Sequence, residues 1–111
     1  MIKGMHAIFF TPQAEELRAF MRDKLGFPFN DVGEGWLIFD VPSADIACHP
    51  DTRTFQDISF YCDDIRATVA QLRERGVEFT TDIRDEGYGL SIMFRMPGDI
   101  EMQLYQPFYQ K

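Results

Sequence analysis

Short apolar runs alternate along the chain with two amphipathic segments, and glycine or proline separates most of them. Residues 3–10 are apolar and aromatic, which predicts a strand. Thr11-Pro12 predicts a helix start, because Thr is a good N-cap residue and Pro suits the first helical position. Gly26 predicts the end of that helix. The helix has apolar residues at spacings of three and four on one face: Leu17, Phe20, Met21 and Leu25.

After this helix the pattern predicts short strands, and the order of elements then starts again. The strands of the first half are expected near residues 28–32, 35–41 and 44–49. In the second half, residues 54–62 predict a strand, Asp63-Asp64 predicts a helix cap, and Gly76 predicts the helix end. The apolar face of that helix holds Ile65, Val69 and Leu72. The final strands are expected near residues 78–84, 89–96 and 100–106.

The two halves match in order and in detail. Residues 25–29 (Leu-Gly-Phe-Pro-Phe) correspond to residues 75–79 (Arg-Gly-Val-Glu-Phe). A repeat of this kind indicates two βαβββ modules, residues 1–51 and 52–111, in a single α+β domain. The competing ferredoxin-like split βαβ fold is disfavoured, because three strands follow each helix.

Side chains alternate along strands, so each strand shows one set to its helix and the other set to a cleft shared by the two modules. The helix-facing set is expected to include Ile58, Phe60, Cys62, Met102 and Leu104. The cleft-facing set is expected to include His6, Ile8, Phe10, Asp57, Ser59, Tyr61, Glu101, Gln103 and Tyr105.

Composition and charge limit the classes of partner that the chain is expected to bind. The chain has 111 residues and a net charge of −7, with a sequence pI of about 4.6. An acidic surface repels phosphate, which disfavours nucleic acid and membranes as partners and attracts a cationic small molecule. Cys48 and Cys62 lack a Cys-x-x-Cys spacing, and no apolar run approaches the length of a membrane span. These features predict reduced thiols and a cytoplasmic protein.

Several of these runs resemble one family over nearly the whole chain. Residues 6–10, 57–65, 75–79 and 102–107 resemble, in order and spacing, the module openings and endings of the vicinal oxygen chelate superfamily. That superfamily includes glyoxalase I, bleomycin resistance proteins and extradiol dioxygenases. The resemblance implies a curled mixed sheet around a ligand cleft, and a homodimer.

The resemblance also implies positions for a divalent metal in the cleft. The matching positions are His6, Ala47, Asp57 and Gln103. Ala47 has no ligand atom, and Asp57 and Gln103 replace the usual His and Glu. His6, Asp57 and Gln103, with Glu101 or His49 nearby, would still offer nitrogen and oxygen donors to Fe, Mn, Ni or Zn. The expectation is an eroded site without a tightly bound metal.

Candidate pocket residues combine aromatic and small polar side chains, as ligand sites often do. They are Ile8, Phe10, Trp36, Ser59, Tyr61, Tyr88, Phe94 and Tyr105. Core packing is the alternative for each aromatic residue. Glu101 is the candidate catalytic acid or base, and a solvated carboxylate at a strand end is its alternative. The loop at residues 84–89 is flanked by glycine and is expected either to cover the cleft or to connect a hairpin.

Three functions are consistent with the sequence. The first is a small-molecule-binding protein with an aromatic cleft. The second is a metal-dependent lyase, isomerase or dioxygenase, in which the metal would chelate vicinal oxygens of the substrate. The third is a catalytically silent, dimeric interaction module. The sequence leaves the ligand and the enzymatic activity open.

Overall fold

The structure, a computed structural model, describes residues 6–44, 47 and 50–109. The chain divides into two compact units, residues 1–56 and residues 57–111. The described elements are two helices and two sheets, one of them mixed, which confirms the predicted α+β class. Neither helix in the described ranges is long and apolar enough to cross a membrane.

Unit 1 contains helix α1, Ala14–Asp23, which begins later than the sequence predicts. Its N-cap residue is Gln13, and the Gln13 N–H donates to Thr11 Oγ1 at 3.2 Å. Thr11 and Pro12 therefore form the turn before the helix, and the predicted Thr11 cap is wrong by two residues. The buried face of the helix is as predicted for Leu17, Phe20 and Met21.

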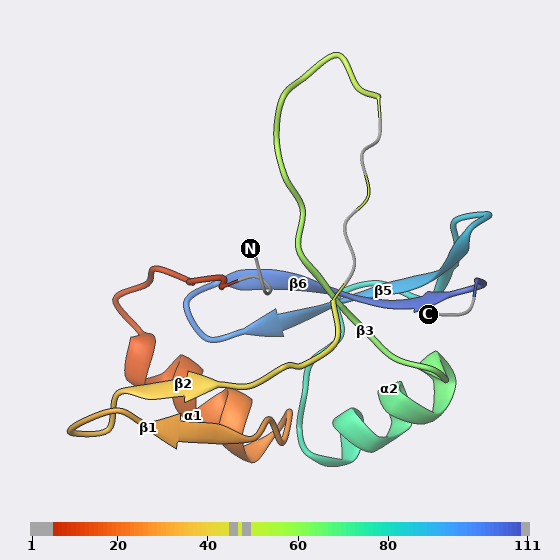
Figure 1. Ribbon diagram of the computed structural model, residues 1–111. Coiled ribbons are helices and arrows are strands. Elements are labelled where there is room, and N and C mark those ends of the chain that lie inside the picture. Colours follow the sequence, from red (N-terminus) through yellow and green to blue (C-terminus); the bar gives the residue numbers. More distant parts are fainter. Residues whose placement is uncertain (1–5, 45–46, 48–49, 110–111) are drawn as a thin grey trace. The chain divides into compact units, whose positions relative to one another are not determined.

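The sheet of unit 1 is a two-stranded hairpin (Figure 1). Strand β1, Phe29–Asp31, pairs antiparallel with β2, Leu37–Phe39. Asp31 Oδ1 closes the turn by accepting from the N–H groups of Gly33 at 2.9 Å and Gly35 at 3.2 Å. Gly35 has a φ of 82°, a conformation that favours glycine. The two strands predicted at 28–32 and 35–41 are thus present but short.

Other predicted strands differ from the structure. In the first half, residues 6–10, 40–41, 44 and 47 fall within predicted strands but form none, and residues 54–58 of the strand predicted at 54–62 likewise form none. The predictions for residues 3–5, 45–46 and 48–49, which include Cys48 and His49, lie outside the described residues. A strand needs a partner for its backbone N–H and C=O groups, and an apolar run indicates burial without identifying that partner.

Unit 2 contains the complete βαβββ order in Figure 1. Its elements are β3 (Ser59–Tyr61), α2 (Ile65–Glu74), β4 (Arg84–Asp85), β5 (Gly89–Met96) and β6 (Ile100–Pro107). The sheet order is β3-β6-β5-β4, with β3 and β6 parallel and the other pairs antiparallel. The strand predicted at 78–84 is reduced to β4 and a single bridge between Phe79 and Phe94.

Helix α2 has the cap that its sequence predicts. The Asp64 side chain accepts from the Ala67 N–H at 3.1 Å, and the Ile65 N–H donates to Gln106 Oε1 at 2.8 Å. Gly76 follows the helix with a φ of 84°. The N-terminus of α2 is therefore fixed by a local cap and by a hydrogen bond from β6, and its C-terminus by a left-handed glycine.

The core of unit 2 lies between α2 and one face of its sheet. Its buried apolar residues are Ile65, Val69, Leu72, Val77, Ile92, Phe94, Met96, Met102 and Leu104. The predicted inward direction of Met102 and Leu104 is confirmed, whereas Ile58 precedes β3 and is 46% exposed. Burial raises the pKa of the half-buried Cys62 thiol, so the protonated form is favoured.

Candidate functional site

The face of the unit 2 sheet opposite α2 gathers most of the predicted site residues of that unit. Tyr61, Tyr105 and Ser91 occupy matching positions on β3, β6 and β5, so their side chains lie side by side. The next row across these strands is Ser59, Gln103 and Met93, and the third is Glu101 and Arg95. We call these eight residues the open face, since the helix within residues 57–109 covers the other side of the sheet.

The Tyr105 ring is held in place by a glycine and by a second tyrosine. A Cβ atom added to Gly89 would overlap the Tyr105 ring, so the ring lies directly over the β5 backbone. The Tyr88 and Tyr105 ring centroids are 6.0 Å apart at an interplanar angle of 57°. The Tyr105 hydroxyl donates a long hydrogen bond of 3.4 Å to the Tyr88 carbonyl. Tyr105 is therefore a fixed aromatic surface on the open face.

Polar groups lie next to this aromatic surface. Gln103 Nε2 donates to Ser59 Oγ at 3.0 Å, and Ser59 is exposed. Ser91 is buried, and its hydroxyl donates to Glu86 Oε1 at 2.8 Å. The Ser59–Gln103 pair can therefore offer hydrogen bonds to a bound molecule, whereas Ser91 anchors the turn that carries Glu86 and Tyr88.

The predicted catalytic residue, Glu101, lies at one end of the open face. It is exposed, and its Oε2 accepts from Thr80 Oγ1 at 3.1 Å. Arg95 is its partner in the β5–β6 register, but the ion pair of Arg95 is with Glu78, at 3.6 Å between Nε and Oε2. An acid–base role for Glu101 stays a prediction.

Phe94, predicted to line a ligand cleft, lies in the core instead. It is 1% exposed and contacts the rings of Phe60 and Phe79, with centroids 6.4 Å and 5.9 Å away. The alternation of β5 puts it on the same side as Ile92 and Met96, which face α2. Phe94 therefore packs in the core on the α2 side of the sheet.

The remaining predicted pocket residues belong to unit 1. Ile8, Phe10 and Trp36 are 59%, 89% and 60% exposed. The Arg18 guanidinium lies 4.5 Å from the centroid of the Trp36 ring, a cation–π contact within this unit. The open face itself brings together Ser59, Tyr61 and Tyr105, with Tyr88 against Tyr105.

The predicted metal ligands come from different parts of the chain. His6 is exposed in unit 1, Asp57 is exposed just before β3, and Gln103 lies within β6. In the described ranges, no three His, Cys, Asp or Glu side chains form a group able to hold a metal ion. Ala47 offers no ligand atom, and His49 lies outside those ranges. Three or four converging donors are the usual requirement, so we derive no catalytic step through a metal.

Sequence reasoning missed two features of this face. Gly89 ends the loop predicted at residues 84–89 and is also the first residue of β5, where a glycine often marks the close approach of another group. The Ser59–Gln103 hydrogen bond links residues 44 positions apart, and no local pattern indicates it.

Comparison with known proteins gives a family match and similar folds. Residues 5–104 match the model of the Glyoxalase/Bleomycin resistance protein/Dioxygenase superfamily. A comparison with curated proteins found no match.

Three solved structures illustrate the likeness. TnmS3, an antibiotic binding protein from Streptomyces sp. CB03234, is 23% identical with a TM-score of 0.67, covering 96% of this chain and 99% of that one. Lactoylglutathione lyase from Agrobacterium tumefaciens is 17% identical with a TM-score of 0.64, covering 94% and 96%. The fosfomycin resistance protein FosX from Listeria monocytogenes is 18% identical with a TM-score of 0.61, covering 100% and 96%. At these identities the likeness shows a shared fold.

Proposed function

Because the chain belongs to the glyoxalase/bleomycin resistance protein/dioxygenase superfamily, we propose that it binds a small organic molecule on the open face of unit 2. The observation that carries this proposal is the row of Tyr61 and Tyr105 beside the Ser59–Gln103 pair. Ligand sites commonly combine an aromatic surface with a few polar groups that fix orientation. The open face has both.

The chemistry of the site favours a planar aromatic ligand, and a cationic one over an anionic one. Tyrosine rings attract cations through their π-faces, and the chain carries a net charge of −7. A polar substituent of the ligand would reach the amide of Gln103 or the hydroxyl of Ser59. That TnmS3 is an antibiotic binding protein and FosX a fosfomycin resistance protein supports an organic ligand of antibiotic size.

A thermal-shift screen of aromatic cations and their neutral analogues tests the proposal. A ligand present at a hundred times its Kd should stabilise the protein by about 2.7 kcal/mol. Tyr105→Ala should then weaken binding about tenfold, equivalent to about 1.4 kcal/mol, because the ring contact is lost. Tyr105→Phe should retain most of the affinity, because the ring stays.

The matched control is Phe55→Ala, which removes an exposed aromatic ring that is not part of the open face. Isothermal titration calorimetry on the unchanged chain, on these three variants and on Tyr61→Ala measures the affinities. If Tyr105→Ala and Tyr61→Ala both bind as tightly as the unchanged chain, the open face is not the binding site.

The proposal also includes a homodimer, a cytoplasmic location and the absence of a tightly bound metal. Twofold homodimers are the commonest oligomers of soluble proteins. The chain has two cysteines, expected to be reduced thiols, which suits a reducing compartment. Light scattering after size exclusion measures the oligomeric state.

A further inference from the structure

A pocket in unit 2 lies on the side of the sheet away from the open face. It is lined by Arg66, Val69, Arg73, Asp82, Ile83 and Ile92, and its volume is about 310 Å³. Helix α2, the segment before β4, and strand β5 contribute these residues. Ile92 alternates with the open-face residues Ser91 and Met93, so its side chain points toward α2. The pocket is therefore separate from the proposed aromatic site.

One face of α2 supplies two cations with an apolar residue between them. Residues 66, 69 and 73 are spaced by three and four positions, so they lie along one side of the helix. Two residues seven positions apart are separated by about 10.5 Å along a helix axis. Val69 and Ile92, which are 4% and 2% exposed, form an apolar floor between the arginines.

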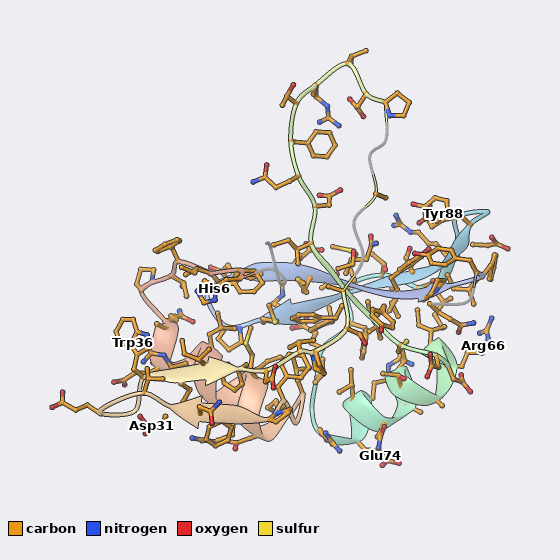
Figure 2. All side chains as sticks on the ribbon, viewed as in Figure 1. His6, Asp31, Trp36, Arg66, Glu74 and Tyr88 are labelled. Atoms are coloured by element: carbon orange, nitrogen blue, oxygen red, sulfur yellow. The ribbon has the colours of Figure 1, made fainter. Side chains whose placement is uncertain are left out.

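Within the described ranges, no carboxylate forms an ion pair with either arginine, Arg66 or Arg73, at a distance of 4.0 Å or less. Figure 2 shows Arg66 projecting from α2 at the surface. The Arg73 guanidinium lies 5.4 Å from the Phe79 ring centroid, a contact that orients it and leaves its N–H groups for an anion. The pocket rim thus carries two positive charges against the single carboxylate of Asp82.

We infer that this pocket binds a small organic carboxylate with a compact apolar body. Guanidinium groups bind carboxylates through paired, charge-assisted hydrogen bonds. The apolar body would contact Val69, Ile83 and Ile92. A volume of about 310 Å³ lies at the lower end of the range for ligand pockets and suits a single ring. Asp82 offsets one of the two positive charges, so the net charge of the rim matches a single carboxylate.

Benzoate is the probe, titrated into the isotope-labelled full chain and followed by amide chemical shifts. The expected result is saturable shifts in α2 and at residues 82–83, with a Kd on the order of 1 mM, as for other small fragments. Benzyl alcohol, of similar shape but neutral, should bind at least about tenfold more weakly than benzoate.

The variant Arg66→Gln/Arg73→Gln should weaken benzoate binding at least about tenfold. Arg75→Gln is the matched control, because it removes the same charge from the end of the same helix, outside the pocket lining. Arg66 is exposed, so Arg66→Gln alone serves as the test if the double variant does not fold.

The inference would be overturned by the absence of a saturable shift with benzoate, by equal binding of benzyl alcohol, or by equal weakening in Arg75→Gln. The variant Tyr105→Ala distinguishes this inference from the proposed function. Tyr105 lies on the open face and does not line the pocket, so benzoate should bind this variant as it binds the unchanged chain. Loss of benzoate binding in Tyr105→Ala, with the arginine variants unaffected, would place the anion on the open face and contradict the inference.

Discussion

Replacing Gly89 by alanine tests whether the Tyr105 ring is seated on the β5 backbone. A Cβ at this position would overlap the Tyr105 ring and lie 2.6 Å from the Gln106 carbonyl oxygen. The ring could turn away, but the carbonyl belongs to the β5–β6 ladder and moves only with the sheet. Apolar atoms pack best at about 3.5–4.0 Å, so the strand must shift to admit the methyl group.

The expected loss of stability follows from two opposing effects. Adding a methylene-sized group to a well-packed site destabilises by about 1–3 kcal/mol. Replacing glycine by alanine restricts the unfolded chain, which stabilises by about 0.4–1 kcal/mol. The steric effect is the larger, and we expect Gly89→Ala to lower the free energy of unfolding by about 1–2 kcal/mol. Ligand affinity at Tyr105 should fall with it.

Urea unfolding followed by circular dichroism measures this difference. Gly87 is the matched control, since it has a φ of 86° and nothing within 4 Å of an added Cβ. Gly87→Ala should destabilise through its backbone conformation, and Gly87→Asn should destabilise less, because Asn tolerates the left-handed region. Gly89→Asn should be at least as harmful as Gly89→Ala. A Gly89→Ala protein within about 0.3 kcal/mol of the unchanged chain would refute the steric argument.

Two further predictions concern the core and the metal. Phe94→Ala should destabilise unit 2 by about 3–5 kcal/mol, because its ring is 1% exposed, and Phe94→Leu should cost clearly less, as measured by urea unfolding; equal losses would contradict the packing argument. Protein purified without a histidine tag should contain no stoichiometric metal, and Fe(II), Mn(II), Ni(II) or Zn(II) should give no increase in Tm that His6→Ala removes. Such an increase would instead favour the metal-dependent enzyme.

Local signals explain which elements could be predicted from the sequence. The strand predicted at residues 89–96 is observed at Gly89–Met96, because glycine precedes it and Pro97-Gly98 ends it. The Asp64 cap of α2 is also local. Residues 6–10 have the composition of a strand but form none, since composition does not supply a hydrogen-bonding partner.

The candidate site could be predicted from the sequence where the alternation of side chains along a strand is enough to decide which face of the sheet a residue lies on. Tyr61 and Tyr105 face the same side of the sheet as expected, and their adjacency follows from the β3–β6 register. Phe94 is predicted at the ligand cleft because its side chain is aromatic. Side chains alternate along β5, however, and Phe94 lies on the same face as Ile92 and Met96, which are buried in the core. The pocket lined by Arg66 and Arg73 could not be predicted from the sequence, because charged residues on an exposed helix face usually indicate contact with solvent. Its other side is formed by residues 82–83, which are distant from these arginines in the sequence.

The parallel pairing of β3 with β6 has a consequence for synthesis on the ribosome. The first strand of unit 2 has its only described sheet neighbour in the last strand of the unit, with Ser59 opposite Gln103. At about 5–20 residues per second, β3 waits about 2–9 s for its partner to be translated. Until β6 is made, β3 has no described neighbour to pair with its backbone N–H and C=O groups, so the sheet of unit 2 can close only after residue 107 has been added.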